Sequence, residues 1–297
     1  MNSKKIRHTT SDKIFYSFIY TVLTLISIII LYPLVFIVAS SFSSGHAITS
    51  GKVFIYPVEF NIDSYKAVFT NSGILVGYRN TLLYTTIGTF IDVFFTLACA
   101  YPLSRKDMPC RSVIMFLFTF TMYFGGGMIP NYLLMINLGL INNPAAVILP
   151  GLIGVYNMIV ARTFMSSLPI ELLEASRIDG CSDARYFFDI LIPLSKACIA
   201  VLCLYYAVGL WNSYFEAFMY LNDRKLYPLS IYLKEILVAN QMTESMDIDA
   251  ELLEKKQGFS DVIKYALIVI TTFPVLCLYP FVQKYFVKGV MIGSVKG

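Results

Sequence analysis

Long stretches of the chain are apolar throughout, and polar residues gather in short segments between them. A helix needs about 20 consecutive apolar residues to cross the hydrocarbon core of a bilayer. Six stretches have roughly that length, so the pattern predicts an all-α integral membrane protein with six transmembrane helices. We expect these spans at residues 14–40, 80–103, 112–128, 144–165, 194–221 and 259–282.

The remaining segments are more polar or are broken by helix-ending residues. The third span ends in the glycines 125–127, and the fourth opens with Asn143 and Pro144, a good cap and first-turn pair. We therefore expect a tail at 1–13, an arm at 41–79, a loop at 104–111, a re-entrant segment at 129–143, a loop at 166–193, a loop at 222–258 and a tail at 283–297.

The first apolar stretch has an alternative interpretation as a cleaved signal peptide. A basic tail precedes it, and the small residues of "VASSFSSG" follow it. However, its apolar run is far longer than the roughly 7–15 residues of such a peptide. We keep it as a span.

The distribution of lysine and arginine predicts the orientation of the spans, because cytoplasmic loops carry an excess of both. Residues 1–13, 105–111, 162–196 and 284–296 together hold fourteen of the 23 basic residues. We therefore expect both termini in the cytoplasm. The arm, the re-entrant segment and the acidic loop at 222–258 would then lie outside.

Composition supports a membrane protein and argues against several kinds of site. The chain is 57% hydrophobic and 14% charged, whereas soluble domains are about 45–50% apolar and about 25% charged. The net charge of +4 is scattered, unlike a nucleic-acid footprint. The six cysteines lack a CxxC spacing, so we expect free thiols and no metal site. His8 and His46 lie in polar segments, and we expect both to be solvated.

A short charged helix is predicted in the loop at 166–193, where the chain reads "ELLEASRIDG". Pro169 suits a first helical turn, and Glu171 and Glu174 lie toward the positive end of the helix dipole. Gly180 is placed to adopt the left-handed conformation that ends a helix. Ser182 can cap a second helix, so we expect a helix, a turn and a helix outside the membrane.

One side of this helix is predicted to carry Leu172, Leu173, Ala175 and Ser176, at helical spacing. The pattern favours two interpretations equally. The helix either packs against the ends of its own spans or docks in a pocket on a soluble partner.

The stretch "EASRIDGCSDARYFFDILIP" resembles the loop signature of permease subunits of ATP-binding-cassette importers. That signature is Glu, two small residues, three residues, Gly, nine residues, Ile, one residue, Leu and Pro. It falls here on Glu174, Ala175, Ser176, Gly180, Ile190, Ile192 and Pro193. Ser176 replaces the usual second alanine, and Ile192 replaces the usual leucine.

Other stretches resemble the carbohydrate-importing, maltose-type branch of this family, and the likeness weakens only in the arm at 41–78. They are "AYPLSRKD" at 100–107, "LGLINN" at 138–143, "VGLWNSYFEAFMYL" at 208–221 and "YFVKGVMIGSVKG" at 285–297. The stretch "YFGGGMIPNYLLMINLGL" resembles a subgroup associated with complex or uronate-containing oligosaccharides.

The resemblance implies a type I importer in a bacterial plasma or inner membrane. In it this chain pairs with a second permease, a paralogue, while an extracellular binding protein delivers substrate. Two ATPase subunits would hold ATP and magnesium, since the chain has no G-x-x-x-x-G-K-[ST] loop and is expected to be neither an enzyme nor a cofactor binder. The helix around Glu174 would insert into an ATPase cleft. The residues expected to couple the two subunits are Glu171, Leu173, Glu174, Ala175, Ser176, Asp179 and Gly180.

Candidates for the substrate path lie in the second and fifth expected spans. Asp92 is near mid-membrane, where an acid is costly and defaults to a functional hypothesis. Trp211, Asn212, Tyr214 and Glu216 combine aromatic faces with hydrogen-bonding groups, which suits a saccharide. Pairing of Asp92 with a neighbouring span, and an interfacial aromatic belt, remain alternatives.

Two other classes of protein stay open at this point. An ion-coupled carrier would need no ATPase and would use Asp92, with Asp261 and Lys264 in the sixth span, but no convincing internal repeat is present. A membrane scaffold would use the polar helix only to recruit a soluble protein.

Overall fold

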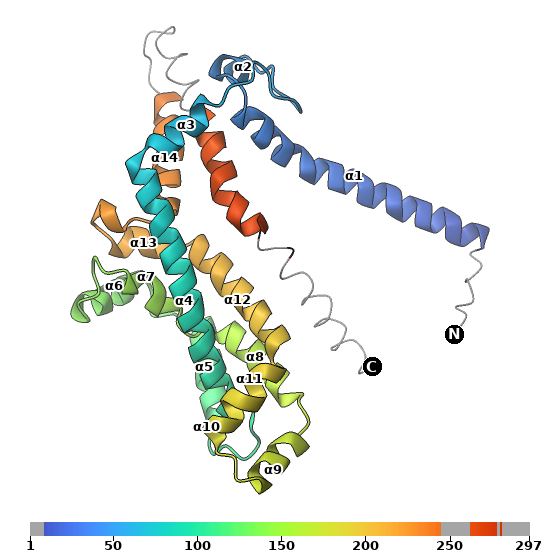
Figure 1. Cartoon of the computed structure of the whole chain (residues 1–297), viewed down its shortest axis with the longest axis vertical. Helices are drawn as coiled ribbons and strands as arrows, with labels where there is room; N and C mark the ends of the chain where they lie inside the picture. Colours follow the sequence, from blue (N-terminus) through green and yellow to red (C-terminus); the bar gives the residue numbers. More distant parts are fainter. Residues whose placement is uncertain (1–8, 245–261, 278–279, 281–297) are drawn as a thin grey trace. The chain divides into compact units, whose positions relative to one another are not determined.

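The computed structural model describes residues 9–244, 262–277 and 280, and this part of the chain is helical with no strand. Figure 1 shows the helices, and the chain divides into two compact units. Unit 1 comprises residues 1–70 and 236–270, and unit 2 comprises residues 71–235 and 271–297. Each unit is described by itself.

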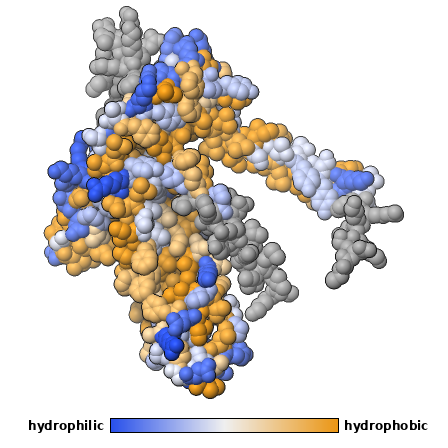
Figure 2. Space-filling model, viewed as in Figure 1, coloured by the Kyte–Doolittle hydropathy of each residue, from blue (hydrophilic) through white to orange (hydrophobic). Residues whose placement is uncertain are grey.

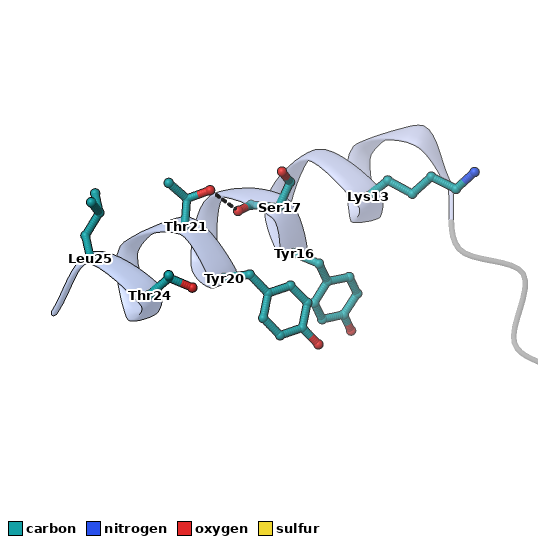
Figure 3. Close-up of a pocket in the computed structure, with 7 residues that line it drawn as sticks. All are labelled: Lys13, Tyr16, Ser17, Tyr20, Thr21, Thr24 and Leu25. Atoms are coloured by element: carbon teal, nitrogen blue, oxygen red, sulfur yellow. Dashed lines mark hydrogen bonds between the residues drawn. The ribbon is translucent and has the colours of Figure 1, made fainter. Parts of the chain in front are cut away.

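Unit 1 begins with the long helix α1 (Thr10–Ser41). A capping box starts this helix, because Thr9 accepts from the Asp12 backbone and Asp12 accepts from the Thr9 backbone. Most apolar side chains of α1 are exposed, as expected for a helix that faces lipid or another subunit. A hollow along α1 is lined largely by hydroxyl-bearing side chains, and Thr21 donates to the Ser17 carbonyl there (Figure 3).

The arm expected after the first span contains two short helices of unit 1, α2 (Gly45–Thr49) and α3 (Asp63–Thr70). Ala39, Ala47 and Val53 form a small buried cluster there. Ser64 donates to the Ser41 carbonyl at 3.1 Å, which ties α3 to the end of α1. The arm is therefore a folded element rather than an open loop.

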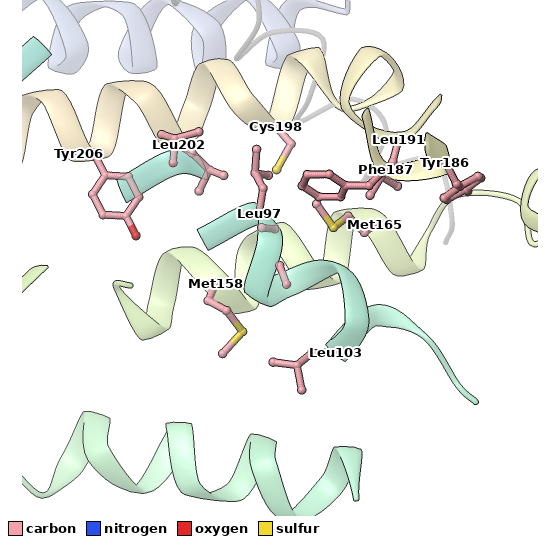
Figure 4. Close-up of a cluster of buried hydrophobic side chains, with 13 residues drawn as sticks. Leu97, Leu103, Met158, Met165, Tyr186, Phe187, Leu191, Cys198, Leu202 and Tyr206 are labelled. Atoms are coloured by element: carbon pink, nitrogen blue, oxygen red, sulfur yellow. The ribbon is translucent and has the colours of Figure 1, made fainter. Parts of the chain in front are cut away.

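Unit 2 is built around three helices, α4 (Ser72–Ser104), α8 (Val155–Ser166) and α12 (Lys196–Trp211). Both α8 and α12 pack along α4. Their shared core includes Leu97, Met158 and Leu202 (Figure 4). Tyr206 joins all three helices, because its hydroxyl lies 2.6 Å from Thr96 Oγ1 and accepts from the Gly154 backbone at 2.9 Å.

Several apolar segments of unit 2 are bent rather than straight. The helices α5 (Arg111–Tyr123) and α6 (Met128–Asn137) meet at 113°. This bend fits either a broken span or a re-entrant loop, so the re-entrant segment stays a prediction. A 51° bend separates α7 (Ala145–Ile148) and the 3-10 turn η1 (Leu149–Gly151) from α8. A further 83° bend precedes α12, after α10 (Asp183–Arg185), the π-helical η2 (Tyr186–Leu191) and α11 (Ile192–Leu194).

Length and composition allow two to five membrane spans within the described residues. Only α1 and α4 qualify alone, and three more spans result if each bent pair counts as one. For the expected sixth span, 259–282, the structure describes residues 262–277 and 280, where the helix Val262–Cys277 lies. The loop expected at 222–258 contains η3 (Arg224–Leu226) and α14 (Leu229–Glu244), after α13 (Phe215–Tyr220). Residues 1–8, 245–261, 278–279 and 281–297 lie outside the described part, and Asp261 is among them.

Candidate functional site

The charged helix expected at 171–180 is α9 (Glu171–Ile178), which lies at one end of unit 2 beside α10 (Figure 1). Gly180 has φ of +75°, the left-handed conformation predicted for it. Ser182 accepts from the Arg185 backbone and caps α10, as predicted. Pro169 lies outside the helix, two residues before its first turn. Hydrophilic surface gathers around this end, next to apolar helices (Figure 2).

The structure separates the four residues expected to share one side of α9. Leu173 packs against the core of unit 2, and Ser176 is buried and donates to the Leu173 carbonyl. Leu172 and Ala175 instead lie on the exposed side. Ile178, which the sequence did not single out, is the most exposed large apolar residue there, at 86%. The first interpretation therefore holds for the side with Leu173 and Ser176, while docking of the exposed side on a soluble partner stays a prediction.

The acidic residues expected to act on α9 are all exposed. Glu171 and Glu174 occupy the first turn, where the helix dipole favours negative charge. Asp179 is the residue that ends the helix. A cavity of about 420 Å³ lies against the inner side of α9, between the ends of α4 and α8. Tyr101, Leu173 and Glu174 contribute to its walls, so α9 is not fully packed on that side.

A cluster of ion pairs borders the same cavity. Arg105 follows α4 directly, and its guanidinium donates to Asp107 at 2.6 Å and to Asp183 of α10. Arg177 of α9 donates to the same carboxylate oxygen of Asp107, Oδ2, at 3.2 Å. Hydrogen bonds from the Arg105 guanidinium lower the pKa of Asp107 below its ordinary value. The sequence analysis used Arg105 and Arg177 only to predict orientation and did not pair them with Asp107 or Asp183, because the partners lie far apart along the chain.

Asp92 lies inside unit 2, where its side chain is only 1% exposed. Its Oδ1 atom has no hydrogen-bond partner among the described residues, and the same holds for the hydroxyls of Thr85 and Thr89. With Thr81 and Thr96, these residues follow one another at spacings of three or four, so they form a polar column along one face of α4. The column ends at the Thr96 contact with Tyr206.

The other expected path residues surround a break between α12 and α13. Trp211 is buried, its indole N–H donates to the Thr271 carbonyl at 3.0 Å, and its ring meets Tyr78 edge-on at 6.0 Å. Asn212 is exposed at the break, although it donates to the Val208 carbonyl. Tyr214 and Glu216 are half-buried. Trp211 is thus a packing residue within this chain, while the other three border the break.

At the opposite end of α4 from α9, the segment around η3 is fastened to the helix. Asn80 donates to the carbonyls of Lys225 and Tyr227 at 2.7 and 3.1 Å. Tyr84 donates to the Leu226 carbonyl, and Thr81 accepts from the Leu229 backbone, both at 2.8 Å. The side chains of Arg79, Arg224 and Lys225 are exposed at this end. We call these three residues the η3 basic patch.

The described residues contain no group of three or more histidine, cysteine, aspartate or glutamate side chains that could hold a metal ion. All six cysteines are free.

Residues 72–292 match the family model described as "Binding-protein-dependent transport system inner membrane component". The chain is 41% identical to the protein LplC of Bacillus subtilis strain 168, over 89% of each chain. It is 38% identical to the polygalacturonan/rhamnogalacturonan transport system permease protein YtcP of the same organism, over 96% of this chain and 99% of the other. A crystal structure of a bacterial ABC transporter involved in the import of the acidic polysaccharide alginate superposes with a TM-score of 0.85 at 33% identity. That match covers 94% of this chain and 99% of the other.

Proposed function

Because this chain belongs to the family of binding-protein-dependent transport system inner membrane components, we propose that it moves acidic oligosaccharides into the cell. It is a multi-pass permease subunit of an ABC importer for oligosaccharides in a bacterial inner membrane, and it is a non-catalytic component. Membership of the family implies a complex with an ATPase and a binding protein.

The observation that carries the acidic substrate is the whole-length likeness to a polygalacturonan/rhamnogalacturonan permease, together with the likeness to an alginate importer. Uronate units carry a carboxylate, which exposed basic residues attract. The η3 basic patch supplies such residues beside the first turns of α4.

For the assembly, we propose a second permease, a paralogue of this chain, two ATPase subunits that hold ATP and magnesium, and surrounding lipid. The α9 end would face the cytoplasm, as would both termini. Glu171, Glu174, Ala175 and Asp179 would meet the ATPase from the exposed side of α9, with Leu172 and Ile178 adding apolar contact. Leu173 and Ser176 would act by holding α9 on its own core, and Gly180 by turning the chain back.

For the substrate path, we propose Asp92, Asn212, Tyr214 and Glu216 as contacts, with Trp211 supporting them. The support is the unpartnered oxygen of Asp92 and the break between α12 and α13. Discontinuous helices near the bilayer midplane commonly expose hydrogen-bonding groups to a substrate.

Uptake of a labelled oligogalacturonate by proteoliposomes that contain the complete assembly tests this function. Uptake should require ATP, and Glu174→Lys or Gly180→Pro should leave the chain inserted while separating hydrolysis from uptake. Uptake that continues without ATP would instead support an ion-coupled carrier. An assembly that binds an ATPase but transports nothing would support a scaffold.

A further inference from the structure

The ion-pair cluster next to α9 joins three separate segments of unit 2, and none of the roles proposed above uses it. Asp107, in the loop after α4, accepts from Arg105 at 2.6 Å and from Arg177 of α9 at 3.2 Å. Arg105 also donates to Asp183 of α10. The four side chains therefore form one line of alternating charge, which we call the clamp, from α9 through the end of α4 to α10.

Arg105 is the centre of the clamp. Its side chain is 14% exposed, whereas those of the other three members are about half exposed or more. The guanidinium also donates to the Tyr101 hydroxyl at 3.2 Å and lies 5.8 Å from the centre of that ring. A guanidinium presents its donors in a planar fork that serves several acceptors at once. A largely desolvated charge keeps its partners, because a buried charge without them is costly.

Apolar packing alone does not fix the position of α9. Leu173 reaches the core, but the cavity of about 420 Å³ remains between α9 and the ends of α4 and α8. Without the clamp, a force applied to α9 could move the helix into this space. The ion pairs of the clamp join distant parts of the sequence. Arg177 and Asp107 are 70 positions apart, and Arg105 and Asp183 are 78 positions apart. By contrast, the pair Arg185–Asp189 lies four positions apart and connects nothing beyond its own helical segment.

We propose that Arg105 is a positioning residue whose ion pairs with Asp107 and Asp183, and through Asp107 with Arg177, make α9 and the adjoining end of α4 move as one rigid body. This inference rests on the proposed function. Movement of α9 by the ATPase then reaches α4 directly instead of being absorbed by the cavity. The clamp thereby sets how much ATP is hydrolysed for each saccharide imported.

The test uses the complete assembly in proteoliposomes and measures ATP hydrolysed per saccharide imported. Asp107→Asn combined with Asp183→Asn removes two charges with almost no change in volume. We expect this ratio to rise about threefold or more, in line with the loss of exposed ion pairs. Asp189→Asn is the matched control, because it removes the same group from a pair within one helical segment, and its ratio should stay at the wild-type value. Arg105→Lys keeps the charge without the fork and should give an intermediate ratio.

A distance measurement separates positioning from general stability. Spin labels are placed on Cys110 and on Ile178→Cys, in a chain without other thiols. They report the distance between the loop that follows α4 and the helix α9. The distance distribution should broaden in the double variant and stay narrow in Asp189→Asn. If the double variant does not fold, Asp107→Asn alone, at an exposed position, takes its place with the same expectations.

Three results are decisive. An unchanged ratio in an importing assembly overturns the clamp but leaves the proposed function intact. Loss of the ATPase from the purified double variant also overturns it, because the cluster would then be a docking contact. A wild-type assembly that does not import with ATP rejects the proposed function itself.

Discussion

Asn80 donates from its side-chain amide to the backbone carbonyl of Lys225 at 2.7 Å, across 145 positions of the sequence. This bond holds the η3 segment against the N-terminal part of α4. Arg79 directly precedes the donor, Asn80, in the sequence. The backbone that carries Arg224 and Lys225 is therefore held in place, while their side chains are exposed and Arg224 pairs with Glu235 at 3.6 Å. A charge carried on a fixed backbone can favour an anionic substrate with little ordering cost.

Neutralising the patch should weaken uptake of acidic saccharides selectively. For Arg79→Gln combined with Lys225→Gln, we expect the KM for an oligogalacturonate to rise about fivefold, because exposed charges each contribute about 0.2–1 kcal/mol. The KM for a neutral oligosaccharide of similar length should change little. The difference in KM for the oligogalacturonate between the variant and the wild-type chain should shrink at high salt. Lys52→Gln, at an exposed lysine of unit 1, is the control, and equal effects on both saccharides would contradict the prediction.

Substitution of Gly180 should impair the protein because of the left-handed backbone at this position, and not because a side chain would be crowded there. Its φ is +75°, and no atom lies within 4 Å of a Cβ placed there. Left-handed backbone costs about 1–2 kcal/mol for an ordinary residue, so Gly180→Ala should lower ATP-driven uptake by about fivefold or more. Gly180→Asn should be milder, since asparagine tolerates this region.

Gly139 offers a matched control for that experiment. It has φ of +67° and equally open surroundings, but it follows α6. Gly139→Ala should bring similar backbone strain without disturbing the turn after α9. Equal loss of uptake in both alanine variants would mean that strain anywhere in unit 2 produces the effect.

Leu172 and Leu173 are adjacent and should have opposite roles. Leu172 is 38% exposed on the free side of α9, whereas Leu173 packs against the core. We expect Leu172→Ala to reduce the amount of ATPase that co-purifies while leaving the melting temperature unchanged. Leu173→Ala should lower stability by about 1–2 kcal/mol, less than a fully buried leucine would. Identical melting curves for the two variants would show that the two sides of α9 are not distinct.

Asp92→Asn should make the chain more stable and less active. The carboxyl is buried, and Oδ1 has no partner among the described residues. Removing the charge should raise stability by about 1–3 kcal/mol, because burying an unpaired charge costs more than burying a neutral amide. The change replaces one accepting carboxylate oxygen by a donating NH2 group, so contacts to substrate hydroxyls should be weakened and uptake should fall. Thr85→Val, which removes another unpartnered atom of the same column, should raise stability without lowering uptake, as measured by thermal melting and transport.

The orientation of the chain can be read from a native thiol. Cys110 is exposed at the N-terminus of α5, close in sequence to the clamp. With the other cysteines replaced, a membrane-impermeant maleimide should label Cys110 in inside-out vesicles and not in right-side-out vesicles. Labelling only in right-side-out vesicles would place α9 on the outer side and would exclude contact with a cytoplasmic ATPase.

Local signals in the sequence were sufficient for the features that depend on one or two residues. The left-handed Gly180 and the cap of Ser182 were both predicted, since each follows from the preferences of a single side chain. The helices α1 and α4 were also expected, although α4 begins at Ser72, eight residues before the expected boundary of 80. The helix begins earlier because Asn71 caps it, its side chain accepting from the backbones of Gly73 and Ile74.

Features that depend on distant contacts were not predictable in the same way. Hydropathy reports how apolar a segment is but not whether it bends, so the break before Tyr214 and the 83° bend before Lys196 were missed. The clamp was missed because Arg105 and Asp183 are 78 positions apart and each looks like an ordinary loop charge. The split between Leu172 and Leu173 was missed because four neighbouring residues on a helix cover too wide an arc to identify the buried side.

The π-helical turn η2 lies between α10 and α12 and contributes to the orientation of one relative to the other. A π-helix holds an extra residue per turn relative to an α-helix, and η2 separates Asp183 from the start of α12. The wider turn holds this extra residue while the helix completes nearly the same rotation, so α10 keeps its orientation relative to the segment that follows. Asp183 therefore still faces Arg105, and homologous chains that have lost one residue here should have an α-helical turn and keep the aspartate–arginine pair.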